Sequence, residues 1–289
     1  MDNRRLYIDL HILQTVPPSC VNRDDTGSPK TAIYGGTTRA RVSSQAWKRA
    51  VRMMFRDGLL GREQLGERTK KIVAMVAEEV TALAPDADAP KLAKKALESA
   101  GLKKVTEEKG TDALFFMSRA QARALAQLAV NGCGEAKEYK SAIKSAPSVD
   151  MVLFGRMVAS DPSLNYDAAA QVAHSISTHA VQNEYDYFTA MDDLAPEDNA
   201  GAGHLGTVEY NSATLYRYAT VNALELEKHL GRAAVPDVVR AFAEAMIRSM
   251  PTGKQNTFAN RTLPDAVYVA LRDDQPVNLC GAFEKAVPP

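Results

Sequence analysis

Charge of one sign, paired cysteines and long hydrophobic runs are all missing from this sequence. Lysine and arginine total 35, and aspartate and glutamate total 35, so the formal net charge is zero. Nucleic-acid-binding proteins often carry a positive excess, so this balance counts weakly against such a partner unless the charge is unevenly distributed. Hydrophobic residues form 45% of the 289-residue chain, which is enough for a large core in one elaborated domain or a domain with insertions.

The three cysteines, Cys20, Cys133 and Cys280, are far apart in the sequence. Because no CxxC or Cys/His metal spacing occurs, we predict neither a disulfide framework nor a zinc site, and we expect no metal and no cofactor. The first ten residues are not followed by an apolar stretch, so no signal peptide is predicted. No segment approaches the roughly 18 apolar residues that a membrane span needs. We therefore expect a cytoplasmic protein with no membrane partner.

Alternation of apolar and polar residues predicts several strands. The first covers residues 6–12 and is expected to end at Pro17-Pro18, because proline cannot donate to a strand ladder. A short apolar run predicts a strand over residues 149–154, and β-forming residues predict a strand or bent hairpin over 207–222. A final alternating strand is predicted over residues 266–271.

Helical periodicity predicts helices over residues 44–56, 166–180 and 238–250, and a mostly helical stretch over 62–145. Residues 19–38 are expected to be a long loop, and 182–206 to be irregular. Without the insertions at 58–146 and 182–206, the order is strand, helix, strand, strand, helix, strand, with one extra helix after the second strand. This order is that of a ferredoxin-like βαββαβ unit, which RNA-recognition domains share, so we predict an α+β fold.

The predicted helix over residues 44–56 has one apolar face and one basic face. The apolar face consists of Ala46, Trp47, Ala50, Val51 and Met54, and the opposite face of Gln45, Lys48, Arg49, Arg52 and Arg56. Between Thr37 and Arg56 there is no acidic residue, whereas there are six basic ones, including Arg39 and Arg41. A bound polyanion would relieve the repulsion among them, which is about a few tenths of a kcal/mol per pair.

Other features extend this basic face. Ser43 and Ser44 lie at the helix start, where Ser43 or Ser44 can cap the helix and unpaired N–H groups can hold a phosphate. Arg23 and Lys30 in the preceding loop add positive charge. A solvated surface face is the alternative interpretation, and the missing acidic residues count against it.

Motifs spread along the chain in a fixed order resemble those of the CasC-type backbone subunit (Cas-seven superfamily) of the type I-E CRISPR surveillance complex, called Cascade. The motifs are PPSCVNRDD, AIYGGTTRARVSSQAWKRAVR, FGRM, AHSISTHAV, YFTAMDDL, HLGTVEY, LYRYATVN and AFEKAV. They are scattered from residue 17 to residue 287 outside the predicted helical insertion, and their combination is far more specific than any single motif.

The resemblance implies a hand-shaped protein with an RRM/ferredoxin-like palm, a helical fingers insertion and a protruding thumb hairpin. The palm would comprise residues 1–57 and 147–289, with the thumb at about 182–206, and the fingers would comprise 58–146. Such subunits stack as a helical filament along CRISPR RNA and present the guide for pairing with target DNA. The implied partners are therefore CRISPR RNA, target DNA through the guide, copies of this chain and other Cascade subunits, in a non-catalytic role in antiviral defence.

The resemblance also assigns residues to RNA contact. On the palm these are Arg23, Lys30, Ser43, Gln45, Lys48, Arg49 and Arg52. Met157 would be an apolar contact beside a displaced base, and Phe188 and Thr189 would be thumb residues that wedge against the strand. For Met157 and Phe188, packing in the protein's own core is the alternative.

Asp24 and Asp25 are the best candidates for catalysis, because related subunits use a loop aspartate to cleave RNA with metal help. Adjacent loop residues point apart, however, and Asn-Arg-Asp-Asp is also ordinary turn chemistry. His174 and His179 are five residues apart, so they do not share a helix face as a metal pair would. Gly35-Gly36 is either a turn or a close approach to phosphate, and Asp192-Asp193 either repels nucleic acid or pairs with a neighbouring subunit.

Three functional hypotheses follow. The first is the non-catalytic guide-RNA scaffold. The second is a metal-dependent ribonuclease that uses Asp24/Asp25. The third is a protein-interaction module whose basic face docks on an acidic partner.

Overall fold

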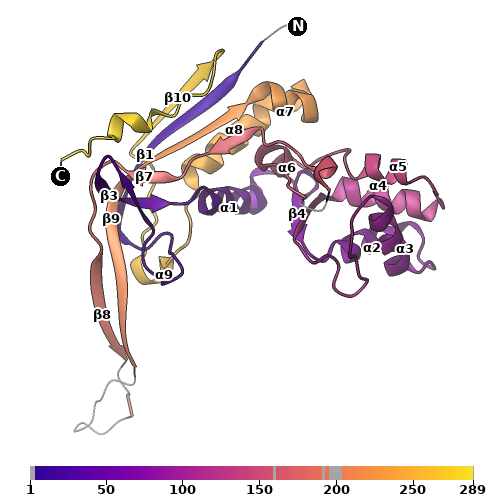
Figure 1. Ribbon diagram of the computed structural model, residues 1–289, viewed down its shortest axis with the longest axis horizontal. Coiled ribbons are helices and arrows are strands. Elements are labelled where there is room, and N and C mark those ends of the chain that lie inside the picture. Colours follow the sequence, from indigo (N-terminus) through magenta and orange to yellow (C-terminus); the bar gives the residue numbers. More distant parts are fainter. Residues whose placement is uncertain (1–3, 159–160, 191–192, 195–203, 289) are drawn as a thin grey trace. The chain divides into compact units, whose positions relative to one another are not determined.

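The computed structural model describes residues 4–158, 161–190, 193–194 and 204–288, which form two compact units (Figure 1). Unit 1 comprises Met1–Tyr7, Arg52–Gln171 and Val221–Phe242. Unit 2 comprises Ile8–Val51, Val172–Thr220 and Ala243–Pro289. These boundaries differ from the expected division at residues 57/58 and 146/147. Unit 1 contains the expected insertion at 58–146 and also residues 1–7, 52–57, 147–171 and 221–242.

Unit 2 is built on a large sheet. Its strand order is β10 (Ala266–Arg272), β1 (Tyr7–Ser19), β9 (His204–Asn222), β7 (Ser175–Ser177), β3 (Thr37–Val42) and β2 (Thr31–Tyr34). β6 (Ala170–Val172) and β8 (Glu184–Ala190) also pair with β9. The pairs β2–β3, β3–β7, β7–β9 and β8–β9 are antiparallel, so the predicted α+β class is confirmed as mixed helix and sheet.

β1 confirms the first predicted strand but differs from it in two ways. It continues through Pro17 and Pro18, which are exposed, to Ser19. It is also buried on both faces, because Asp9 and His11 are as enclosed as Leu10 and Ile12. Alternation of this kind is typical of a half-buried strand, so it located β1 correctly but underestimated its burial.

The expected long loop over residues 19–38 contains a β-hairpin. β2 and β3 are joined by Gly35 and Gly36, with Tyr34 opposite Thr37. Both glycines have positive φ, +56° and +74°, as a tight hairpin turn of the I′ type requires. A Cβ at Gly35 would also lie 1.7 Å from the carbonyl oxygen of Glu284, so the C-terminal segment packs directly on this turn.

Two predicted elements were wrong in type. Residues 149–154 form the helix α6 (Val149–Phe154), which begins after Ser148 and ends at Gly155 with φ +78°. Residues 166–180 contain the strands β6 and β7 in place of a helix. Periodicity does not separate a short buried helix from a buried strand, and pairing with β9 overrides the helical preference of the alanines at 168–170.

The expectation that residues 182–206 are irregular was also wrong, because they contain β8 and the first residues of β9, which pair with each other. The other helices and strands predicted outside residues 58–146 are confirmed. α1 (Ser44–Met54) continues into a π-helical turn (Phe55–Leu59). β9 covers the strand expected at 207–222, α8 (Val235–Arg248) the helix expected at 238–250, and β10 the final strand. Unit 2 also contains α9 (Gln255–Phe258) and the 3-10 helix Leu279–Phe283.

Unit 1 is mostly helical, as predicted for 62–145. Its helices include α2 (Ile72–Leu83), α3 (Ala89–Ser99), α4 (Arg119–Val130), α5 (Ala136–Ala142), α6 and α7 (Ala223–Leu230). A two-stranded sheet pairs β4 (Gly66–Thr69) with β5 (Phe115–Ser118), and short 3-10 helices cover Arg62–Gln64, Pro162–Leu164 and Arg232–Ala234. The core centres on Ile72, Val76, Leu97, Met117 and Leu125. Among the described residues, no helix has the length and apolar character to cross a membrane.

Candidate nucleic-acid interface

The start of α1 is fixed by the loop that precedes it. The Ser43 hydroxyl accepts a hydrogen bond from the Ala46 N–H at 3.3 Å, so Ser43 is the capping residue. The Ser43 N–H in turn donates to the Asn22 side chain at 2.9 Å. Ser43 is buried, so this candidate RNA contact serves the helix end itself.

The apolar face of α1 is anchored in unit 2 through Trp47. The Trp47 indole N–H donates to the Ser175 hydroxyl at 2.9 Å, and its ring stacks 3.7 Å from the guanidinium of Arg217. Arg217 is enclosed in the core, where burial lowers its pKa to about 9. Its guanidinium donates to the Gln14 side chain at 2.5 Å and to the Met246 carbonyl.

The opposite face of α1 carries Gln45, Lys48 and Arg49, because the helical repeat places them away from Trp47. Gln45 and Arg49 are exposed and Lys48 is half-buried. Burial lowers the pKa of Lys48. Across the described part of the chain, neither Lys48 nor Arg49 has an acidic side chain in ion-pair range. This pair of cations, the Lys48/Arg49 pair, is therefore available to an external anion.

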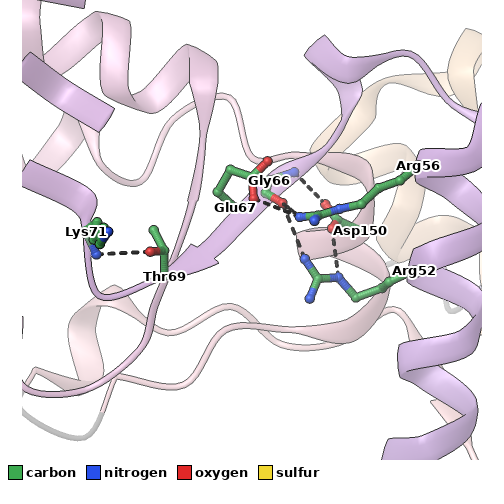
Figure 2. Close-up of polar contacts among 7 residues, drawn as sticks. All are labelled: Arg52, Arg56, Gly66, Glu67, Thr69, Lys71 and Asp150. Atoms are coloured by element: carbon green, nitrogen blue, oxygen red, sulfur yellow. Dashed lines mark hydrogen bonds and ion pairs between the residues drawn. The ribbon is translucent and has the colours of Figure 1, made fainter. Parts of the chain in front are cut away.

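Arg52 and Arg56, in unit 1, differ from the Lys48/Arg49 pair because each has an acidic partner. Figure 2 shows these contacts. The Arg52 guanidinium lies 3.0 Å from the carboxylate of Asp150 and donates to the Gly66 carbonyl at 3.3 Å. Arg56 forms a 2.8 Å ion pair with Glu67. The inference that the basic face lacks acidic partners was therefore wrong for these two arginines, because their partners come from distant segments of the chain.

Arg39 and Arg41 also add less surface charge than the sequence suggests. Arg39 is fully buried, where it donates to the carbonyls of Ser177, Phe283 and Glu284. Arg41 donates to the Thr31 carbonyl and lies 3.2 Å from the ring of His174. Arg39 is thus a structural residue, and counting it in a surface patch was wrong.

The loop before β2 is an ordered turn. One Asp24 carboxylate oxygen accepts hydrogen bonds from the Thr26 hydroxyl at 2.7 Å and from the N–H groups of Thr26 and Ser28 at 3.0 Å. These hydrogen bonds lower the pKa of Asp24, and the bond from the Thr26 hydroxyl has the largest effect. Arg23 is exposed and Lys30 half-buried on this loop. Asp24 therefore has a structural task, as the turn interpretation predicts.

No group of three or more His, Cys, Asp or Glu residues placed to hold a metal occurs among the described residues. His174 stays beside Arg41, and the His179 ring accepts from the Thr214 N–H at 3.2 Å. Asp192 lies outside the described residues.

Met157 is 85% exposed, so core packing is the wrong interpretation for it. Its sequence neighbour Arg156 is buried. The Arg156 guanidinium donates hydrogen bonds of 2.9–3.1 Å to the carbonyls of Leu164, Phe116 and Ile143. Burial lowers the pKa of Arg156 to about 10. Arg156 thus fixes the backbone from which the Met157 side chain extends.

Phe188 and Thr189 lie on the hairpin formed by β8 and the N-terminal part of β9 (Figure 1). Every residue of β8 is exposed, and Phe188 is 42% exposed, so burial in a core is wrong for it as well. Residues 195–203 lie outside the described residues. Phe188 and Thr189 belong to the range 182–206, which the resemblance assigns to the thumb, and their contact with RNA stays a prediction.

Aromatic side chains gather on one face of the sheet: His11 of β1, Tyr216 and Tyr218 of β9, and Tyr268 of β10. The C-terminal segment packs on this aromatic face, where Phe283 contacts the ring of Tyr216. The Asp9 carboxylate accepts from the Tyr218 hydroxyl at 3.1 Å and from the Val277 N–H at 3.0 Å, and the Tyr216 hydroxyl accepts from the Leu279 N–H at 3.0 Å. Burial raises the pKa of Tyr216 to about 12. The polar residues at alternate positions of β1, Asp9 and His11, were the signal in the sequence for this cluster. No local pattern pointed to Asp150.

These features define the class of the protein: it is an α+β protein with an antiparallel sheet, the Lys48/Arg49 pair on one helix, and exposed apolar side chains at Met157 and Phe188. A family model described as "CT1975-like protein" matches residues 8–289, and the chain belongs to this family.

Two solved structures are similar to the chain. A chain of a "CRISPR RNA-guided surveillance complex, pre-nicking" is 34% identical with a TM-score of 0.83, covering 98% of this chain and 83% of that one. A chain of a "CRISPR RNA-guided surveillance complex" is 32% identical with a TM-score of 0.61, covering 98% and 76%. No curated protein matches.

Proposed function

We propose that this chain is a non-catalytic, CRISPR RNA-binding backbone subunit of an RNA-guided surveillance complex. The carrying observation is the 34% identity over 98% of the chain to a component of such a complex, at a TM-score of 0.83. The Lys48/Arg49 pair supplies a physical reason for an RNA partner, because one half-buried and one exposed cation without acidic partners in the described part of the chain favour a bound phosphate chain.

The fold supports the palm, fingers and thumb description. The elements β1, α1, β7, β9, α8 and β10 follow the βαββαβ order, with β7 in the place first given to residues 149–154. The helices α2 to α5 would be the fingers, and the β8–β9 hairpin the thumb. Because the C-terminal segment covers the aromatic face of the sheet, RNA would follow α1 and its neighbouring loop instead of stacking on that face.

In this proposal the RNA backbone is held by Lys48 and Arg49, and Gln45, Arg23 and Lys30 add further polar contacts. Ser43 would act indirectly, because it is buried and caps the helix. Arg52 contributes less, because Asp150 already balances its charge. Such contacts read the phosphate backbone, so binding would be independent of base sequence.

Met157, Phe188 and Thr189 would meet displaced bases. Met157 and Phe188 are exposed apolar side chains, and an apolar or aromatic contact to a base contributes roughly 1–3 kcal/mol without reading its identity. Copies of the chain would line up along one guide in a helical filament of the type I-E kind, with other subunits, and leave the guide free to pair with target DNA.

The ribonuclease alternative receives no support from the Asp24 geometry. One oxygen of Asp24 is occupied by three donors of its own turn, which suits a loop-stabilising carboxylate. We therefore propose that the chain holds RNA without cutting it.

Co-expression with a CRISPR RNA tests this function. The purified protein should carry RNA, and the length protected from nuclease should grow in regular steps with the number of bound copies. Protein that is purified free of nucleic acid, with an absorbance ratio typical of protein, and that binds no added RNA would contradict the proposal and favour the protein-interaction module.

A further inference from the structure

Phe188 and Gly206 face each other across the β8–β9 hairpin. They are directly paired in the antiparallel register, between the pairs Tyr187–Thr207 and Thr189–Leu205. A glycine inside a strand weakens it, because glycine loses more conformational freedom on folding and has no side chain to pack. A two-stranded ribbon is already marginal in water, so glycine at this position needs a reason.

The backbone at Gly206 does not supply that reason. Gly206 is absent from the glycines with positive φ, so its conformation is open to any residue. The reason lies in the opposite side chain. A Cβ at position 206 would be 2.4 Å from Cζ of Phe188 and 2.7 Å from its Cε1. The far end of the Phe188 ring therefore occupies the space of a side chain at 206.

We infer that Gly206 is a positioning residue, which seats the Phe188 ring in the orientation that meets RNA bases. This inference rests on the proposed function and deepens it. Any larger residue at 206 would push the ring aside, because the overlap is with the tip of a side chain that can rotate about its own bonds. The strand pairing would persist, since the clash does not involve the backbone of β8.

This predicts an unusual pattern of mutational effects. Gly206→Ala removes no group that could touch RNA, and alanine is at least as compatible with a strand as glycine. A loss of RNA binding in this variant must therefore act through the ring. The effect should disappear when the ring is absent, because Phe188→Ala vacates the same space.

A double-mutant cycle on the full chain tests the inference. The variants are Phe188→Ala, Gly206→Ala, the double variant and Thr207→Ala, an exposed control on the other face of the hairpin. The probe is a single-stranded guide-length RNA with 2-aminopurine at successive positions, whose fluorescence rises when a base is unstacked. Affinity is measured in the same titration, and circular dichroism follows thermal unfolding.

We expect Gly206→Ala to weaken binding about tenfold and to reduce the periodic 2-aminopurine signal, as the loss of one stacking contact would. It should have no further effect in the Phe188→Ala background, and Thr207→Ala should resemble the wild type. The inference about Gly206 would be overturned if Gly206→Ala bound RNA as tightly as the wild type. It would also be overturned if Gly206→Ala weakened binding as much in the Phe188→Ala background as in the wild type. Either result would leave the proposed function intact. Unchanged binding and signal in Phe188→Ala would instead overturn the proposed role of the thumb.

Discussion

The carboxylate of Asp150 lies 3.0 Å from Nε of Arg52, across 98 positions of the chain. Asp150 is 1% exposed, and its second oxygen accepts the Gly66 N–H at 2.9 Å. This contact divides the basic face of α1 into two functional parts. Arg52 belongs to the packing of unit 1, whereas Lys48 and Arg49 have no acidic side chain in ion-pair range among the described residues.

The buried pair should therefore matter for stability. Asp150→Ala leaves the Arg52 guanidinium and the Gly66 N–H without their acceptor, and we expect it to lower the free energy of unfolding by about 3 kcal/mol. Glu67→Ala breaks the exposed pair with Arg56 and should cost about 1 kcal/mol or less. Chemical denaturation measures both, and equal effects would contradict a structural role for Asp150.

Lys48 should make stability depend on pH. Burial lowers its pKa below the usual value of about 10.4. Between the lowered pKa and about 10.4 the unfolded chain binds more protons than the folded chain, so stability rises with pH through that window. Below the lowered pKa, Lys48 is charged in both the folded and the unfolded chain, so the half-buried charge destabilises the folded state to its full extent.

Lys48→Met should therefore raise the Tm most near neutral pH, and the difference from wild type should shrink as the pH approaches about 10.4. Lys95→Met, at an exposed lysine of α3, is the matched control and should leave the Tm unchanged. A pH-independent difference for Lys48→Met would show that the ammonium group carries no such cost.

Met157 and Arg156 should separate function from stability. Met157→Ala truncates an 85% exposed side chain and should change the free energy of unfolding by less than about 0.5 kcal/mol, while base displacement beside it weakens. Arg156→Ala leaves three buried carbonyl oxygens without their hydrogen-bond donor and should lower the free energy of unfolding by about 3 kcal/mol. Thermal unfolding together with 2-aminopurine fluorescence distinguishes the two; normal base displacement in Met157→Ala would remove Met157 from the interface.

Asp24→Asn tests the rival ribonuclease function. The low pKa of Asp24 means that its turn is stabilised above the unfolded value near 3.9 and loses that stabilisation as the pH falls through the folded pKa. Around neutral pH the substitution should loosen the loop and leave RNA binding nearly unchanged. Cleavage of bound RNA in magnesium by the wild type, abolished in Asp24→Asn, would establish the rival.

Local patterns in the sequence predicted several helices and strands. Alternation located β1 and β10, and the two-faced pattern of residues 44–56 located α1 together with its buried Trp47. Residues 149–154 were mistaken for a strand because a short segment with five apolar residues out of six fits either element. The helix that these residues form ends at Gly155, whose φ is +78°.

Long-range pairing was the part that local patterns could not supply. The absence of acidic residues near Arg52 and Arg56 was real within the 20-residue window, yet Asp150 and Glu67 reach them from elsewhere in the chain. β7 is likewise short and exists through its pairing with β3 and β9. The exposure of Met157 depends on how Arg156 is bonded, which no local pattern encodes.

The salt dependence of RNA binding by a Lys48→Ala/Arg49→Ala variant tests the central claim most directly. Each phosphate neutralised on a single strand contributes about 0.7 to the slope of log affinity against log salt, so the variant should bind every RNA sequence more weakly, with a slope shallower by about 1.4 per protomer. A variant that kept the wild-type affinity and slope would contradict an RNA backbone lying across this face of α1.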